Sequence, residues 1–256
     1  MGRSAARPWT DGRPPHLPVS VGQLPEVCLL PGDPARVDLA GEVLDGYRIL
    51  GQNREFRVGK GRYRGTEIAV CSTGIGGPST EIALVELAGL GVRTVIRIGG
   101  MGALRADLAP GTVSVVTSAV RESGAARHYL PPDAPARPDP MVAAALTAAA
   151  GACGRPSQEI TILSTDSYYL GQGRPVDGLE PAAAERLGRV RALDVDGMDM
   201  EAETVLAVGG ALGLAAGAAL IVHANRATDA WLEEYADPQR EIVRVAAEAA
   251  AGLSTP

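Results

Sequence analysis

Short apolar strands alternate with helical segments along most of the chain, and this alternation constrains the fold more than any other feature of the sequence. Strand-like apolar runs cover residues 26–30, 67–71, 92–98, 112–119, 159–163, 193–196 and 215–223. Helical spacing covers residues 33–44, 79–90, 141–150, 200–212 and 238–253. Strands that alternate with helices predict an α/β fold, with a mostly parallel sheet and helices on both of its faces. Ligands are expected at the carboxyl ends of such strands.

The length and charge of the chain limit the classes of protein to which it can belong. Its 256 residues fit one large α/β domain as easily as two small ones. The net charge is −6 and no segment is strongly basic, so a nucleic-acid partner is not expected. Residues 1–12 are rich in Pro, Arg and Gly and lack periodicity. We predict a disordered leader there and a single domain over residues 13–256.

The three cysteines, Cys28, Cys71 and Cys153, form no CxxC pair and are odd in number. Buried thiols in a reducing cytoplasm explain them better than a disulfide framework or a zinc site, and no metal site is predicted. The longest apolar stretch, residues 211–222, is too short to span a bilayer. The first residues have no apolar segment typical of a signal peptide. The sequence therefore predicts a cytoplasmic protein without a membrane partner.

Two glycine-rich strand ends are candidates for ligand loops. In the first, Gly32 follows a strand and Arg36 follows four residues later, so a backbone N–H and a guanidinium group could hold one anion together. A plain turn with a solvated Arg is an equal alternative for this segment. The second, residues 71–79, lacks both the Lys-Ser/Thr of a P-loop and the GxGxxG spacing. A tight turn that needs small residues for close packing is favoured there.

Arg97 lies inside an apolar strand, in the segment TVIRIGG. A charged side chain in such a place is costly to bury without a partner. An anionic ligand or an internal Asp or Glu would serve. The ligand is the favoured interpretation, because the other glycine-rich strand ends are expected nearby.

Six segments, taken in order, carry a resemblance to a known family: LLPGDPARV, NREF, VCSTGIGGPSTEIALVELAGLGVRTVIRIG, SYYLGQGR, MDMEAETVL and ANRAT. They resemble the uridine phosphorylases, which belong to the trimer- and hexamer-forming nucleoside phosphorylases. The resemblance covers about residues 15–250. It implies a single-domain, three-layer α/β/α sandwich with a mixed, partly barrel-like central sheet. It also implies self-association into dimers and hexamers, with active sites shared at dimer interfaces.

The resemblance implies a phosphate site and a neighbouring ribose site. Phosphate would be held by Gly32, Arg36, Arg97 and Gly100, with Arg54 supplied by the neighbouring subunit. Several guanidinium groups suit a dianion, because each can donate two hydrogen bonds to it. The ribose would contact Met200, Glu201, Asp199 and, across the interface, His16. The carboxylate of Glu201 would accept both ribose hydroxyl groups. Considered alone, Glu201 could equally be a residue that stabilises a helix N-terminus.

The base site implied by the resemblance consists of Gln172, Arg174, Tyr168 and His223. A Gln amide offers one donor and one acceptor, which complements the edge of uracil. Arg174 can hydrogen-bond a uracil carbonyl and stabilise negative charge on the departing base. Purine-specific relatives usually have an Asp near the end of the chain, where residues 223–229 here read HANRATD. Gln172 and Arg174 therefore indicate a pyrimidine base.

The predicted function is phosphorolysis of a pyrimidine nucleoside, uridine or a modified uridine-like nucleoside, to the free base and ribose 1-phosphate. Arg97, Glu201 and Arg174 would carry the catalysis, as in a pentosyltransferase. No cofactor is required and inorganic phosphate is the co-substrate. The resemblance also implies a structural potassium ion at the dimer interface, held by Glu55, Ile75 and Ser79.

Three residues depart from the pattern of the family. Gly100 stands where the family has Thr, Asp199 where it has Glu, and His223 where it has an aliphatic residue. These departures motivate the hypothesis of a nucleoside modified at the base or at the ribose 5′ position. Two rival functions remain: a hydrolytic nucleosidase on the same fold and a non-catalytic nucleoside-binding protein.

Overall fold

The structure is a computed structural model that describes residues 4–131, 133–155 and 157–253. Within these residues, ten strands form one sheet: β1 (Val27–Pro31), β2 (Asp45–Asn53), β3 (Phe56–Tyr63), β4 (Thr66–Cys71), β5 (Thr94–Ala103), β6 (Val113–Glu122), β7 (Gln158–Thr165), β8 (Gly197–Asp199), β9 (Ala215–Asn225) and β10 (Ala230–Trp231). The α-helices are α1 (Pro34–Leu39), α2 (Gly77–Gly89), α3 (Pro140–Ala152), α4 (Glu180–Arg191), α5 (Ala202–Ala211) and α6 (Ala236–Leu253). Three 3₁₀ turns are η1 (Ala40–Glu42), η2 (Ala126–His128) and η3 (Leu170–Gln172).

The sheet is partly closed into a barrel. Its strand order is β10-β9-β6-β7-β8-β5-β1-β4-β3-β2, and a further pairing of β9 with β5 closes the ring β9-β6-β7-β8-β5. The pairs β1–β4, β1–β5, β5–β9, β6–β7 and β7–β8 are parallel. The pairs β2–β3, β3–β4, β5–β8, β6–β9 and β9–β10 are antiparallel. The mixed, partly barrel-like sheet expected from the sequence is confirmed.

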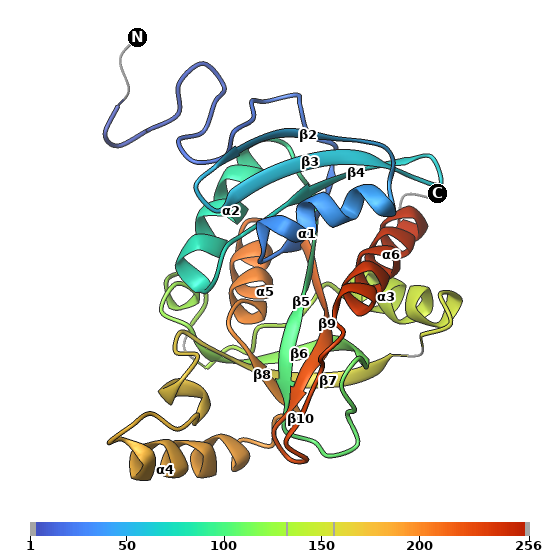
Figure 1. Ribbon diagram of the computed structural model, residues 1–256. Helices are drawn as coiled ribbons and strands as arrows, with labels where there is room; N and C mark the ends of the chain where they lie inside the picture. Colours follow the sequence, from blue (N-terminus) through green and yellow to red (C-terminus); the bar gives the residue numbers. More distant parts are fainter. Residues whose placement is uncertain (1–3, 132, 156, 254–256) are drawn as a thin grey trace.

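Helices cover the sheet on both faces, which gives the expected three layers (Figure 1). On one face α2 and α5 pack over an apolar core that includes Leu84, Val95 and Val205. On the other face α1, α3 and α6 pack over a second core that includes Val37, Ile98 and Ile242. Each core contains fully buried aliphatic side chains of β1 and β5, so these central strands are apolar on both sides, as parallel strands between helices must be.

Local signals explain where several helices begin. The Asp33 side chain accepts a hydrogen bond from the Ala35 N–H at 2.9 Å, and Pro34 occupies the first turn of α1. Asp139 caps α3 in the same way, followed by Pro140. An Asp cap before a Pro is a strong start signal, because the cap satisfies an N–H of the first turn and Pro needs none.

Some elements differ from the sequence prediction. The helix expected over residues 33–44 ends at Leu39 and continues only as the turn η1. The short strand expected over residues 193–196 is wrong, since β8 covers Gly197–Asp199. Strands β2 and β3 and helix α4 were not predicted. Of the predicted leader, residues 1–3 lie outside the described residues. Farther along it, the ring of Trp9 packs against Gly89 of α2.

The described thiols form no disulfide, and burial raises the pKa of Cys28 and that of Cys71, the latter to about 12. Cys153 is partly exposed. Among the described helices, none combines the length and the apolar character needed to cross a membrane.

Candidate active site

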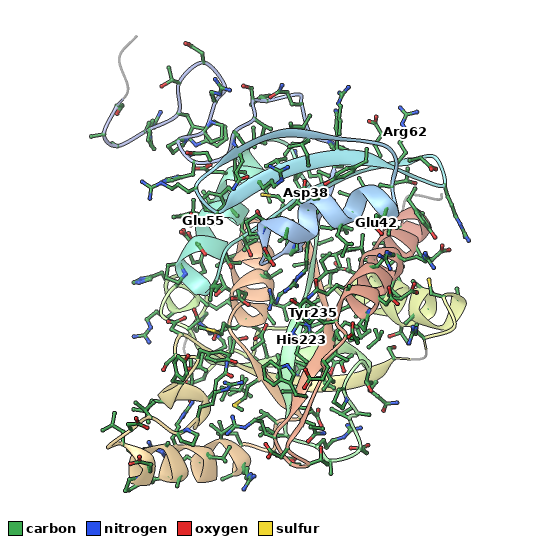
Figure 2. All side chains as sticks on the ribbon, in the orientation of Figure 1. Asp38, Glu42, Glu55, Arg62, His223 and Tyr235 are labelled. Atoms are coloured by element: carbon green, nitrogen blue, oxygen red, sulfur yellow. The ribbon has the colours of Figure 1, made fainter. Side chains whose placement is uncertain are left out.

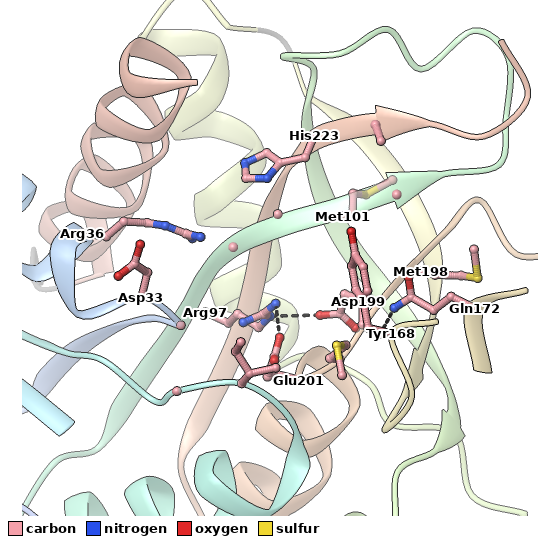
Figure 3. A pocket seen from close by; sticks show the side chains of 18 of the residues that line it. Asp33, Arg36, Arg97, Met101, Tyr168, Gln172, Met198, Asp199, Glu201 and His223 are labelled. Atoms are coloured by element: carbon pink, nitrogen blue, oxygen red, sulfur yellow. Dashed lines mark hydrogen bonds and ion pairs between the residues drawn. The ribbon is translucent and has the colours of Figure 1, made fainter. Parts of the chain in front are cut away.

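A cavity of about 960 Å³ lies at the end of β1. Strand β1 ends at Pro31, while its neighbour β5 extends beyond the paired region to Ala103. Its walls come from strand ends and from the loops that follow them, as expected for an α/β sheet. Residues from all three predicted subsites line it (Figure 3): Gly32, Arg36, Arg97, Gly100, Tyr168, Gln172, Arg174, Asp199, Met200, Glu201 and His223. The structure therefore brings together in one cavity most of the residues singled out from the sequence.

Arg97 is buried and lies between two carboxylates. Its Nε lies 3.0 Å from Asp199 Oδ2 and its Nη2 lies 2.6 Å from Glu201 Oε2. Burial by itself would lower the pKa of Arg97, but Glu201 and Asp199 together raise it above its ordinary value. The sequence favoured an anionic ligand as the partner of Arg97; the structure supplies internal carboxylates, the second alternative. The two carboxylates contact Nε and Nη2, so other N–H groups of the guanidinium can still donate to a ligand.

Asp199 is enclosed, and its carboxylate accepts hydrogen bonds from three donors. Oδ2 accepts from Arg97 Nε and from the Ala202 N–H at 2.9 Å, while Oδ1 accepts from Ser164 Oγ at 2.5 Å. Its side chain has no solvent exposure. These contacts join Arg97 to the start of α5, so Asp199 fixes the guanidinium group relative to the helix that follows Glu201.

Glu201 precedes α5 and contacts the glycine-rich loop after β4. Its Oε1 accepts from the Gly76 N–H at 2.6 Å, while Oε2 faces Arg97. Burial raises the pKa of Glu201, and the Arg97 guanidinium opposes this shift. Both contacts come from donors, and the charge of Arg97 favours the carboxylate form. Because each oxygen can accept two hydrogen bonds, both remain able to accept from a ligand.

Arg36 and Gly32 form the end of the cavity next to β1. Arg36 Nη1 lies 3.5 Å from the Ile98 carbonyl oxygen, a weak contact. Its buried Nε has no hydrogen-bond partner among the described residues. Burial, followed by the proximity of Arg97, lowers the pKa of Arg36. The charges of Arg36 and Arg97 are close enough to repel each other, and the nearby carboxylates of Asp33 and Glu201 partly offset this repulsion.

Tyr168, Gln172 and Arg174 form another wall, on the loop that includes η3. The Arg174 guanidinium lies 3.8 Å from the centre of the Tyr168 ring, in a cation–π contact. Arg174 Nη1 donates to the Tyr168 carbonyl at 2.7 Å and to Gln172 Oε1. Gln172 is buried, and its Nε2 donates to the Asp199 carbonyl at 3.3 Å. Burial lowers the pKa of Arg174.

Arg54 and His16 do not line the cavity of their own chain. Arg54 lies exposed at the turn between β2 and β3, with φ of 52°. His16 Nδ1 contacts Glu86 Oε1 at 2.7 Å, and its carbonyl accepts from Asn53 Nδ2 at 2.8 Å. The two predicted cross-subunit residues thus belong to the same edge of the molecule.

Three residues that contribute to the site were missed in the sequence. The Gly76 N–H holds Glu201, although tight packing was favoured for its loop. Arg226 donates to the Gln172 and Gly173 carbonyls at 3.0 and 3.1 Å and so fixes the η3 loop. The half-exposed Trp231 lines the cavity. Gly76 and Arg226 had a signal, since each lies in a segment that carries the resemblance, whereas Trp231 lies in none of them.

A family model described as the phosphorylase superfamily matches residues 26–255. The chain belongs to this superfamily. It is 39% identical over 252 residues to a uridine phosphorylase of Thermococcus kodakarensis, covering 96% of this chain and 91% of the relative. A guanosine phosphorylase of Halorubrum lacusprofundi is 38% identical over 214 residues, 82% of this chain and 83% of its own. A uridine phosphorylase of Haemophilus influenzae is 37% identical over 245 residues, 91% and 97% of the two chains.

Membership in the superfamily identifies the architecture as the nucleoside phosphorylase fold and the chain as a nucleoside phosphorylase, for which nucleoside and phosphate are the substrates. The relatives include enzymes named for a pyrimidine nucleoside and one named for a purine nucleoside. Among the described residues, no group of three or more His, Cys, Asp or Glu is arranged to hold a metal ion.

Proposed function

We propose that this protein splits a pyrimidine nucleoside with inorganic phosphate to the free base and ribose 1-phosphate. The substrate is uridine or a uridine-like nucleoside modified at the base or at the ribose 5′ position. The observation that carries the proposal is that one cavity is lined by three sets of groups. They are the guanidinium groups of Arg36 and Arg97, the carboxylate of Glu201, and the pair Gln172 and Arg174. These groups match a phosphate, a ribose diol and a pyrimidine edge.

Phosphate binds between Gly32, Arg36 and Arg97. Arg97 keeps N–H groups that neither carboxylate uses, and Arg36 Nε is buried without a partner among the described residues. Gly99 supports this arrangement, because a Cβ atom there would lie 2.7 Å from Arg97 Nη2. Only glycine lets the guanidinium group lie against the strand.

The ribose lies over Met200, with its two hydroxyl groups on Glu201. Arg97 and the Gly76 N–H hold that carboxylate in place, so it needs no reorganisation to accept the diol. Asp199, predicted as a ribose contact, has its oxygens occupied by Arg97, Ser164 and Ala202. We assign it to positioning Arg97.

Base recognition by Gln172 and Arg174 favours a pyrimidine. Purine-specific members of the family usually have an Asp near the end of the chain, and residues 223–229 here place no Asp in the cavity. Asn225 is buried, with Nδ2 donating to the Arg105 and Leu108 carbonyls and Oδ1 accepting from the Ala227 and Thr228 N–H groups. The exposed Asp229 does not line the cavity.

The reaction follows from these positions. The glycosidic bond lengthens and its electron pair leaves with the base, where Arg174 and Gln172 stabilise the negative charge. The sugar becomes oxocarbenium-like, and Glu201 and the phosphate oxygens stabilise its positive charge. A phosphate oxygen then bonds to the anomeric carbon. Holding both reactants in one cavity supplies much of the rate.

Arg54 and His16 complete the site of a second copy of the chain. Arg54 is exposed and His16 is partly exposed on one edge, outside their own cavity, which supports a dimer whose subunits exchange these side chains. We propose that such dimers assemble into a hexamer. Glu55, Ile75 and Ser79 meet nearby. Ser79 Oγ lies 3.3 Å from the Ile75 carbonyl, and a Cβ atom on Gly74 would touch both Glu55 and Ser79. A carboxylate, a carbonyl and a hydroxyl oxygen fit a structural potassium ion at this interface.

An absorbance assay with uridine, guanosine and 5′-modified uridines, each with and without phosphate, tests the proposal. We expect base release from a pyrimidine nucleoside that requires phosphate. Release that continues without phosphate would indicate a hydrolytic nucleosidase, and tight nucleoside binding without turnover would indicate a binding protein. Preference for guanosine would refute the assignment of the base.

A further inference from the structure

His223 and Gly100 occupy one another's space. A Cβ atom built on Gly100 would lie 2.7 Å from His223 Nδ1, 2.8 Å from Cε1 and 3.0 Å from Cγ. Contacts this short involve three atoms along the Nδ1 side of the ring, so any side chain at position 100 would force the imidazole out of its place. The two departures from the family pattern therefore depend on each other: the ring can lie over β5 only because residue 100 is glycine.

The imidazole lies on the same face of the sheet as Arg36. Arg36 belongs to α1, and the Tyr235 ring, 6.3 Å from the His223 ring, precedes α6; both helices cover the face opposite α5 (Figures 1 and 2). In Figure 3 the Arg36 guanidinium extends toward the region beside His223. The two side chains are close enough for Arg36, after burial, to lower the pKa of His223. His223 is thus associated with the predicted phosphate residues.

The base residues lie farther along β5. Arg174 Nη2 is 3.7 Å from a Cβ atom built on Gly102, two residues beyond Gly100. Gln172 and Tyr168 lie on that side of the cavity, across from Arg36 (Figure 3). This order separates His223 from the base wall, to which the sequence assigned it.

Two polar atoms at this end of the cavity lack partners. His223 Nε2 and Arg36 Nε are both shielded from solvent and form no hydrogen bond with the described residues. The side chains that carry them both line the cavity. Arg36 Nε is a donor, and His223 Nε2 is one in the tautomer that carries its proton there. An oxyanion offers acceptors to both.

We propose that His223, admitted by Gly100, is an additional ligand of the phosphate co-substrate. The imidazole replaces the hydroxyl group that a Thr at position 100 would provide and donates a hydrogen bond to a phosphate oxygen. This inference rests on the proposed function only for the location of phosphate.

The test is phosphate affinity, measured by titration calorimetry with inorganic phosphate alone and by the KM for phosphate in turnover. His223→Ala should weaken phosphate binding about tenfold, as expected for loss of one charge-assisted hydrogen bond, and leave the KM for nucleoside unchanged. His223→Gln places a side-chain amide near the position of Nε2 and should retain affinity within about threefold. His128→Ala, which removes an exposed histidine outside the cavity, is the matched control.

A double-mutant cycle tests the dependence of the two residues. Gly100→Ala should weaken phosphate binding as much as His223→Ala does, and adding it to His223→Ala should cost nothing further. The proposal would be overturned by additive losses in the double mutant or by an unchanged phosphate affinity in His223→Ala. It would also be overturned if His223→Ala raised the KM for nucleoside instead of the KM for phosphate. Wild-type protein that binds phosphate through His223 but releases no base would refute the proposed function and leave this inference standing. Turnover that requires phosphate, with no effect of His223→Ala on phosphate affinity, would support the proposed function and refute this inference.

Discussion

Replacement of Asp199 by Asn tests whether this residue compensates the charge of Arg97. The carboxylate receives three donors, Arg97 Nε, the Ala202 N–H and Ser164 Oγ, and is closed to solvent. An amide has one acceptor oxygen, and its nitrogen would face at least one of these donors. Arg97 would also keep only Glu201 as a counter-charge.

The expected loss is large because both partners are buried. Breaking a buried ion pair by removing one charge costs about 3–5 kcal/mol. For a chain of this size, each kcal/mol lowers the melting temperature by about 2–4 °C, so Asp199→Asn should melt roughly 6–20 °C below wild type. Phosphate affinity should fall as well, because Arg97 loses the contact that orients it.

Thermal unfolding followed by calorimetry, together with the KM for phosphate, is the assay. Asp199→Glu is the control: it keeps the charge but adds a methylene group, which costs about 1–3 kcal/mol in a packed site. It should melt above Asp199→Asn and bind phosphate more tightly. An Asn variant that melts within about 2 °C of wild type, with unchanged phosphate affinity, would refute the assignment of Asp199.

Three other substitutions and conditions have definite expected outcomes. Glu201→Gln should lower kcat/KM by about 100-fold, since it weakens stabilisation of the sugar cation, and steady-state kinetics would measure this; a fall below threefold would count against it. The pKa of His223 is lowered in the folded protein, so the unfolded chain takes up the proton more readily. Stability should therefore fall as pH drops below about 6.5, and His223→Asn should show a smaller fall in urea unfolding at pH 7.5 and 5.5. The buried Glu86 carboxylate accepts from His16 and Leu17, so Glu86→Gln should destabilise the chain by about 1–3 kcal/mol and weaken subunit association in sedimentation; unchanged association would disconnect this segment from the interface.

The fold could be predicted where burial leaves a pattern in the sequence. Strands β1, β4, β5 and β9 are buried on both faces and therefore appear as continuous apolar runs. Strand β2 is largely exposed, with no apolar alternation, and α4 exposes most of its residues, so neither has a clear pattern. The closure of the barrel by β9 and β5 is a tertiary contact that no local signal encodes.

The residues of the site likewise include some with a local signal in the sequence and others that only the fold brings together. Arg97 was conspicuous because a charge in an apolar strand is costly, and the sequence limited its partner to a ligand or a carboxylate. Its actual partners, Asp199 and Glu201, lie about a hundred residues away, and only the fold brings them together. The contact between Gly100 and His223 likewise joins neighbouring strands, β5 and β9. Separate departures from a family pattern proved to be one structural feature.

In the proposed reaction a phosphate oxygen, and not water, takes the place of the base on the sugar. Product analysis by ³¹P NMR after incubation with uridine and phosphate tests it most directly. We expect a sugar 1-phosphate formed in equal amount to the free base, and no free base without phosphate. Free ribose as the sugar product, formed at a rate independent of phosphate, would contradict it.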